Sequence, residues 1–366
     1  MTDSPSTISN PPSISQPPRL EHPVRITDQS WPEGTVPIVS IICFAYNHEK
    51  FIREAIEGFL MQETTFPVEI IIHDDASTDG TADIIREYES KHPQIFRNML
   101  QKENHMSQGG DFNGPIFQHT RGEFIALCEG DDYWIHKEKL ELQMNLIQRD
   151  IGSTFCSAKA KVLSDSGQYV GHICPSYIKA FYNLSDVIRN YLFHTSTFLI
   201  RKKTLVFPEW FYSAGFTNGD EAIVALCAGA GQLAYLDKVV SVYRQHQGGM
   251  WTGRSKIEAI KSGKASLDAI NAHYMFAYTA EVRQRYILSI KNALNNAIND
   301  RKYSEARAVF NSFAFDIYTF GCNEFLRLMY RAYMYPLILK WHRFTMLISV
   351  RTRLRRFLSH NEIKRQ

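Results

Sequence analysis

The chain lacks several features that mark particular classes of protein. It has no run of 18 or more apolar residues, which argues against a conventional membrane span. No basic segment followed by an apolar one opens the N-terminus, so we expect no secretory signal. The six cysteines are scattered without a C-x-x-C pair, which argues against a zinc ribbon or a disulfide scaffold and fits a reducing compartment. The chain has 366 residues of ordinary globular composition, which is enough for about two domains.

Charge is distributed unevenly along the chain. The segment Arg327–Gln366 holds ten Lys/Arg and one acid, a net charge of +9, whereas the remaining residues carry a net charge of −6. Large apolar side chains are interleaved with these basic residues, which is typical of a helix lying in a membrane interface. We therefore predict contact with an anionic membrane rather than with nucleic acid. A C-terminal helix that packs on the body is the alternative.

Proline is rare except at the N-terminus. Residues 1–37 contain eight of the 14 prolines among many serines, a composition that predicts a disordered lead-in. The pattern then changes to runs rich in β-branched residues at Val39–Phe44 and Val68–Ile72, each followed by helical spacing, and to a third run at Phe124–Cys128. Strands and helices that alternate through short connections predict a parallel α/β sheet. From about Ser255 the spacing predicts helices only.

The predicted strands end in polar and acidic residues. Asp74-Asp75 follows the second strand, and Glu129-Gly130-Asp131-Asp132 follows the third. Ligands of open sheets bind beyond the carboxyl ends of the strands. Neighbouring carboxylates repel each other unless a cation lies between them, and Mg²⁺ or Mn²⁺ takes one or two protein carboxylates plus phosphate oxygens. We therefore expect a metal–diphosphate site at this edge, with Asp132 as an exposed carboxylate.

Four segments agree in order and spacing with the motifs of a known family: VSIICFAYN (39–47), EIIIHDDASTDGT (69–81), RGEFIAL (121–127) and EGDDYW (129–134). Residues 38 to about 150 resemble the nucleotide-sugar-binding half of family 2 glycosyltransferases. The resemblance implies an α/β fold of the GT-A type, which has a Rossmann-like nucleotide-sugar-binding sheet, here with a C-terminal α-helical extension.

The resemblance also implies a nucleotide pocket. Phe44, Ala45 and Asn47 would line it, and Tyr46 would stack on the base unless it is a packed turn aromatic. Asp75 would accept a hydrogen bond from the base.

The same resemblance implies how the phosphates are held. Asp131 would lie near the ribose, and Asp132 would bind the Mn²⁺ or Mg²⁺ ion that bridges the two phosphates. Glu129 stands where the family often has Asp. In a loop that resembles a recurring family segment, Arg244 offers donors to phosphate, and His246 could complete the metal shell or form a hydrogen bond with a phosphate.

An inverting transfer needs a general base. In the family this carboxylate opens a helix about eleven positions before a glycine, and Asp220 stands in that relation to Gly231. Glu221 is the alternative base. His194 with the three residues that follow it could help to form the acceptor pocket.

The predicted function is an inverting, metal-dependent glycosyltransferase that uses a nucleotide-sugar donor. The acceptor would be a glycan or a lipid-linked glycan in bacterial cell-surface polysaccharide or lipopolysaccharide biosynthesis. The rivals are a non-catalytic nucleotide-sugar-binding protein and a sugar nucleotidyltransferase. We expect a cytoplasmic protein whose tail can reach the inner face of the membrane. The predicted domains are a GT-A domain over 38–252, divided into donor (38–150) and acceptor (151–252) halves, and a helical region with the basic tail over 253–366.

Overall fold

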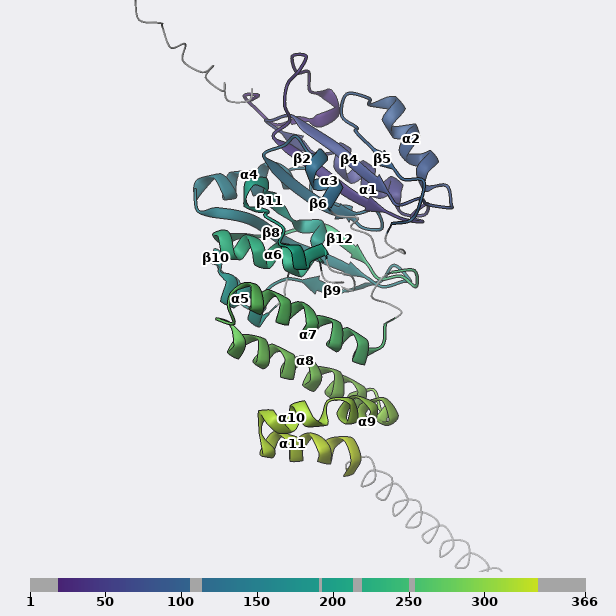
Figure 1. The fold of residues 1–366 in the computed structure, drawn as a ribbon. Helices are drawn as coiled ribbons and strands as arrows, with labels where there is room; N and C mark the ends of the chain where they lie inside the picture. The colour runs from purple at the N-terminus through teal and green to yellow at the C-terminus, as the bar shows by residue number, and fades with distance from the viewer. Residues whose placement is uncertain (1–18, 106–113, 191–192, 213–218, 250–253, 335–366) are drawn as a thin grey trace, which may run out of the picture. The chain divides into compact units, whose positions relative to one another are not determined.

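The computed structural model describes residues 19–105, 114–190, 193–212, 219–249 and 254–334 (Figure 1). Contacts within the chain divide these residues into two compact units. The first ends at Gly249, and the second comprises Ile188–Asn190 and the described residues from 254 onward. The predicted domain limits at 38, 150 and 252 remain predictions.

Residues 19–37 are an ordered part of the first unit, and the prediction that they are disordered is wrong. β1 (Val24–Arg25) pairs antiparallel with β3 (Glu63–Thr64), and Ile26, in the short helix η1 (Ile26–Asp28), is only 4% exposed. A few apolar and main-chain contacts therefore outweigh the proline content of this segment. Residues 1–18 lie outside the described part of the chain.

Four parallel strands form one half of the sheet, and they include the three strands that the sequence predicted. They are β2 (Val39–Ala45), β4 (Val68–Asp74), β5 (Met99–Leu100) and β6 (Phe124–Glu129), in the order β6-β2-β4-β5. The residues of β4 are all buried, and those of β2 and β6 nearly all, as expected for strands covered on both faces. The helices of this half are α1 (Ile52–Leu60), α2 (Thr81–Lys91), α3 (Gly114–His119) and α4 (Lys139–Arg149).

The other half makes the sheet mixed, so the predicted parallel order is only part of the fold. β11 (Leu199–Arg201) runs antiparallel between β6 and β8 (Ser153–Leu163), and β12 (Gln232–Arg244) runs parallel to β8. The short strand β7 (Tyr133–Trp134) pairs with β12 through Ser241 and Val242. This pairing brings the end of β12 beside the acidic residues that follow β6. The remaining elements are β9 (Tyr169–Ile173), β10 (Phe181–Tyr182), α5 (Leu184–Arg189) and the short helices η2 (Thr195–Thr197), η3 (Lys202–Thr204) and η4 (Glu209–Tyr212).

Helix α6 (Gly219–Ala230) ends against the start of β8, and a glycine is required there. A Cβ atom on Gly231 would lie 2.4 Å from the main-chain oxygen of Gly152. Gly231 thus permits the close approach that fixes α6, and with it Asp220, relative to the sheet.

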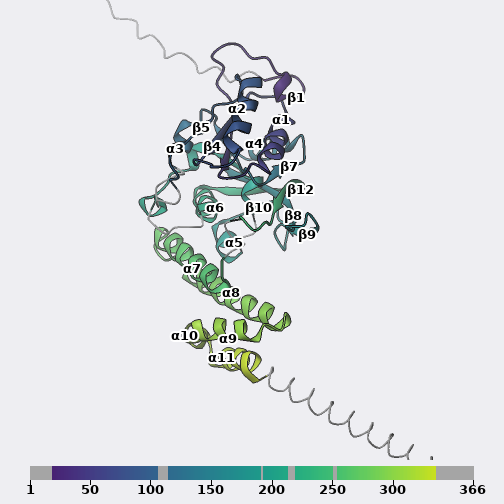
Figure 2. The same cartoon turned by 90° about the vertical axis from the view of Figure 1, so that its right-hand side faces the viewer.

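The second unit is helical, as the spacing predicted. It contains α7 (Lys256–His273), α8 (Thr279–Asn299), α9 (Tyr303–Ser312), α10 (Ala314–Phe320), α11 (Cys322–Met329) and a π-helical turn (Tyr330–Met334). Figures 1 and 2 show α7 and α8 side by side. Among the described helices, none combines the length and the apolar character that a bilayer crossing requires. Most of the predicted basic tail, residues 335–366, lies outside the described part.

Candidate functional site

The carboxyl ends of the three predicted strands meet at one edge of the sheet. The amide of Asp75 donates to the oxygen of Ala45 (3.0 Å), and the amide of Gly130 donates to the oxygen of Phe44 (2.8 Å). These two bonds tie the loops after β4 and β6 to the end of β2. The structure therefore brings together Phe44, Ala45, Asp75 and the acidic segment that begins at Glu129.

The turn after β2 is held by the loop after β4. Asn47 adopts a left-handed conformation (φ 55°), its side-chain oxygen accepts from the Thr78 amide (2.8 Å), and its own amide donates to the Ser77 hydroxyl (2.8 Å). Tyr46 is 44% exposed beside this turn. Asp75 is buried, and its Oδ1 atom accepts from the amide of His105 (2.9 Å). The ring of Tyr46 is thus accessible to a ligand, whereas the hydrogen bonds of Asn47 hold the turn.

Two histidines face the carboxylate of Asp131. The Nε2 atom of His246 lies 3.0 Å from Asp131 Oδ2, and the Nε2 atom of His48 lies 3.7 Å from the same oxygen. Burial acts to raise the pKa of Asp131, but the hydrogen bond with His246 and the proximity of His48 and His246 lower it below its ordinary value. His246 was predicted to share a metal with Asp132, and in the structure its partner is Asp131.

Asp132 is buried (2% exposed), so the expectation of an exposed carboxylate is wrong. Its Oδ1 atom accepts from the amide of Arg244 (2.9 Å), and its Oδ2 atom lies 3.6 Å from His194 Nδ1. Burial, followed by the charges of Asp131 and Glu129, raises the pKa of Asp132 well above its ordinary value. The end of β12 and the segment before η2 cover this side chain. The local sequence around Asp132 does not reveal that these distant segments bury it.

Glu129 completes the acidic cluster. Burial and the charges of Asp131 and Asp220 raise its pKa to about 8, and Oε2 has no hydrogen-bond partner among the described residues. Three crowded carboxyl groups, one with an unpaired oxygen, have the character of a site for a divalent cation. Within the described ranges no group of three or more His, Cys, Asp or Glu side chains is already arranged around one metal position. The cluster fits a Mn²⁺ or Mg²⁺ ion that takes one or two carboxylates and fills its shell with phosphate and water oxygens.

The raised pKa of Glu129 has a testable consequence. Because the folded chain holds this proton up to about pH 8 and the unfolded chain releases it near pH 4.5, the metal-free protein should lose stability as pH rises through that window. We expect Glu129→Gln to flatten the fall in melting temperature between pH 5 and pH 8 in EDTA. Thermal unfolding measures this, with Glu63→Gln, which removes a surface ion pair with Lys137, as the control. Parallel curves for wild type and Glu129→Gln would contradict the assignment.

Asp220 reaches the same cluster from the start of α6. Its Oδ1 atom accepts from the amide of Glu221 (2.8 Å), and its charge is one of the causes that raise the pKa of Glu129. The Asp220 residue is partly exposed, whereas Glu221 is buried (3% exposed). A carboxylate that accepts a proton from an incoming hydroxyl group must be accessible to it. The exposure of the two residues therefore favours Asp220 over Glu221 as the candidate base.

Three residues near the cluster were missed or given another place by the sequence analysis. His48 faces Asp131, Glu54 forms an ion pair with Arg244, and His194 lies beside Asp132. Burial lowers the pKa of His194 to about 4, so its ring is neutral, and it packs on Tyr243 with ring centroids 4.4 Å apart. His48 directly follows the Tyr-Asn turn, which could have signalled it. No local pattern marks Glu54.

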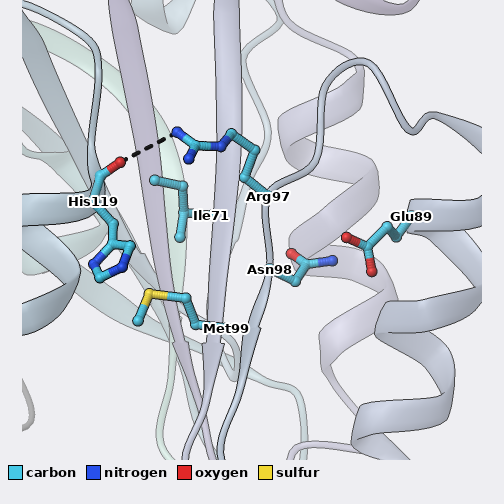
Figure 3. Close-up of a pocket in the computed structure, with 6 residues that line it drawn as sticks. All are labelled: Ile71, Glu89, Arg97, Asn98, Met99 and His119. Carbon is cyan, nitrogen blue, oxygen red and sulfur yellow. Dashed lines mark hydrogen bonds between the residues drawn. The ribbon is translucent and has the colours of Figure 1, made fainter.

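A separate pocket of about 370 Å³ lies along β4 and β5 (Figure 3). Arg97 in this pocket donates to the main-chain oxygen of His119 (3.4 Å). Its lining contains none of the predicted site residues: Ile71, Glu89, Arg97, Asn98, Met99 and His119. The acidic strand ends, rather than this pocket, therefore form the candidate active site.

The chain is similar to known proteins over the region that carries the acidic strand ends. Residues 40–215 match the family described as glycosyl transferase family 2. An uncharacterized protein of Mycobacterium tuberculosis is 32% identical over 253 residues, which cover 64% of this chain and 69% of that protein. The UDP-Glc:alpha-D-GlcNAc-diphosphoundecaprenol beta-1,3-glucosyltransferase WfaP of Escherichia coli is 33% identical over 113 residues, 31% of this chain and 42% of that enzyme.

The fold is also found among solved structures. S. aureus TarS 1-349, in complex with UDP-GlcNAc, matches with a TM-score of 0.55 and 19% identity, covering 76% of this chain and 80% of that chain. The GT-A fold predicted from the sequence, with helices added at the C-terminus, is thereby confirmed. With an acidic cluster at the strand ends and a family match that spans it, the chain belongs to glycosyl transferase family 2 and is a glycosyltransferase.

Proposed function

We propose that the chain is an inverting, metal-dependent glycosyltransferase whose donor is a nucleotide sugar. The observation that carries the proposal is the convergence of Glu129, Asp131 and Asp132, at the end of β6, with Asp220 at the start of α6. One set of carboxylates suits a metal-bound diphosphate, and a separate, accessible carboxylate suits the acceptor hydroxyl group.

The donor would lie across the strand ends. In this proposal Tyr46 stacks on the base, Asp75 accepts a hydrogen bond from it, and Phe44, Ala45 and Asn47 shape the pocket. Asp131 lies near the ribose. Asp132 holds the metal, with His246 as a further ligand, and 38–150 serves as the donor half of the GT-A domain.

The acceptor would enter from the side of α6. Asp220 removes the proton of the acceptor hydroxyl group as its oxygen attacks the anomeric carbon, and the bond to the nucleoside diphosphate breaks. A bound divalent cation supplies charge stabilisation for the departing diphosphate. Residues 151–252 serve as the acceptor half.

The relatives support a role in cell-surface polysaccharide or lipopolysaccharide biosynthesis. The name of WfaP gives UDP-Glc as its donor and a sugar carried on diphosphoundecaprenol as its acceptor. The TarS structure contains UDP-GlcNAc. We therefore propose a nucleotide-sugar donor and a glycan or lipid-linked glycan acceptor, reached from the cytoplasmic face of the membrane.

A panel of nucleotide sugars tests the proposal. The melting temperature of the purified chain is measured with each nucleotide sugar, in Mn²⁺ and in EDTA. Release of nucleoside diphosphate is measured in separate, unheated samples. We expect one donor class to raise the melting temperature only with Mn²⁺ and to be consumed. Stabilisation without any turnover, including slow hydrolysis, would instead indicate a non-catalytic binding protein.

The proposed membrane contact is tested by truncation, and the structure decides where to cut. Leu328 and Ala332 are buried in the core of the helical unit, so removal of everything after Leu328 would damage its fold. A chain that ends at Met334 keeps this core and loses eight Lys/Arg and one acid. We expect sedimentation with anionic vesicles at low salt to fall at least tenfold, since each basic residue contributes about 1 kcal/mol near such a surface.

Salt and lipid charge provide the controls for that experiment. High salt should release part of the full-length protein, because exposed charges are screened beyond about 10 Å at 0.1 M. Vesicles of zwitterionic lipid should retain little of it. If the full-length protein does not bind anionic vesicles at low salt, the tail is instead a helix that packs on the body or binds a partner.

A further inference from the structure

One arginine holds both of the consecutive aspartates that follow β6. The amide of Arg244 donates to Asp132 Oδ1 (2.9 Å), and its guanidinium Nη1 donates to the main-chain oxygen of Asp131 (2.8 Å). Two residues further on, His246 contacts the Asp131 carboxylate (3.0 Å). The end of β12 and the loop that follows it therefore fix the main chain and the side chains of the acidic segment together.

The guanidinium group itself is clamped from three sides. Glu54, in the first turn of α1, forms an ion pair with Nη2. The rings of Tyr133 and Phe51 lie 4.1 Å and 5.3 Å from the guanidinium carbon, and the Arg244 side chain is only 13% exposed. The planar, delocalised cation suits both ring stacking and directed hydrogen bonding. In this arrangement the guanidinium is directed to the protein's own groups.

We infer that Glu54 and Arg244 are a positioning pair for the donor site: Glu54 orients Arg244, and Arg244 holds Asp131 and Asp132 in the geometry that receives the metal and the diphosphate. The inference rests on the proposed function and extends it to a residue that no motif marks. It differs from the role predicted for Arg244, which was to donate directly to phosphate. The two roles give opposite results when Glu54 is neutralised.

Glu54→Gln is the discriminating variant. If Glu54 positions Arg244, its neutralisation loosens the acidic segment, and nucleoside diphosphate binding in Mn²⁺ becomes about five- to tenfold weaker. If Glu54 only restrains a phosphate-binding arginine, its neutralisation frees the guanidinium, and binding becomes tighter. Titration calorimetry with UDP and GDP measures the difference. In the transfer reaction we expect KM for the donor to rise by a similar factor while kcat changes by less than about threefold.

The chain offers a matched control on the same helix. Glu57 lies almost one turn after Glu54, is also exposed, and bonds to the Tyr88 hydroxyl (2.6 Å) away from the acidic segment. Glu57→Gln should bind nucleoside diphosphate as the wild type does, and Glu54→Asp should recover part of the lost affinity. The Glu54 side chain is 59% exposed, and exposed ion pairs stabilise folds little, so Glu54→Gln should unfold within a few degrees of wild type.

Hydrogen exchange gives a readout that needs no activity. The amide of Arg244 is bonded to Asp132, and we expect it to exchange at least threefold faster in Glu54→Gln than in wild type or Glu57→Gln, without any ligand. Unchanged exchange, or tighter diphosphate binding, would overturn the positioning role. If the wild type binds no nucleoside diphosphate at all, the proposed function fails, while the exchange result still decides whether Glu54 orders the segment.

Discussion

Asp220→Asn is expected to slow sugar transfer by about 10²- to 10⁴-fold and to leave donor binding unchanged. The amide keeps the shape of the carboxylate and can still accept from the Glu221 amide, but it cannot take the proton of the acceptor. The substitution also removes one of the negative charges that raise the pKa of Glu129, so we expect it not to destabilise the fold. The measurement is a progress curve for nucleoside diphosphate release with acceptor, alongside calorimetry of donor binding.

Glu221→Gln separates the two candidate bases. Glu221 is buried in α6, so its variant is compared at equal folded fraction, as judged by thermal unfolding. Transfer by Asp220→Asn within a few-fold of wild type, together with loss in Glu221→Gln, would move the role to Glu221. Near-normal transfer by both variants would contradict a general base on α6.

Asp132→Asn should lower Mn²⁺-dependent affinity for nucleoside diphosphate by about a hundredfold or more, since it removes the charge that a divalent cation needs. The amide oxygen can still accept from the Arg244 amide. Burial and two neighbouring carboxylates disfavour the ionised Asp132 in the folded state, so its neutral replacement should melt at the same temperature or a few degrees higher without ligand.

Asp83→Asn is the control for that variant, because Asp83 is an exposed carboxylate of α2 paired with Arg86. It should affect neither binding nor melting. Binding by Asp132→Asn with an unchanged need for Mn²⁺ would refute the assignment of the metal to this carboxylate. A large fall in its melting temperature would refute the electrostatic argument.

The sequence was informative where structure depends on local patterns. The β-branched runs at 39–44 and 68–72 predicted β2 and β4, because strands buried on both faces leave an unbroken apolar signature. Composition misled at residues 19–37, where the buried side chain of Ile26 and a few main-chain hydrogen bonds order a proline-rich segment. The antiparallel place of β11 between β6 and β8 could not be predicted, since it depends on long-range pairing.

The candidate site, too, could be predicted only in part. Its acidic residues belong to sequence motifs, and the structure brings them together at one edge of the sheet. Their surroundings depend on residues far apart in the chain: Glu54 and Arg244 are separated by 190 positions, and His194 covers Asp132 from the segment before η2. Such tertiary cover turned a carboxylate expected at the surface into a buried one with a raised pKa.

Anomalous diffraction from crystals grown with Mn²⁺ and a nucleoside diphosphate tests the central claim most directly. The account predicts a manganese peak bonded to the carboxylate of Asp132, with the diphosphate oxygens on the same ion and the base against Tyr46 and Asp75. A manganese ion or a diphosphate bound away from the end of β6 would contradict it.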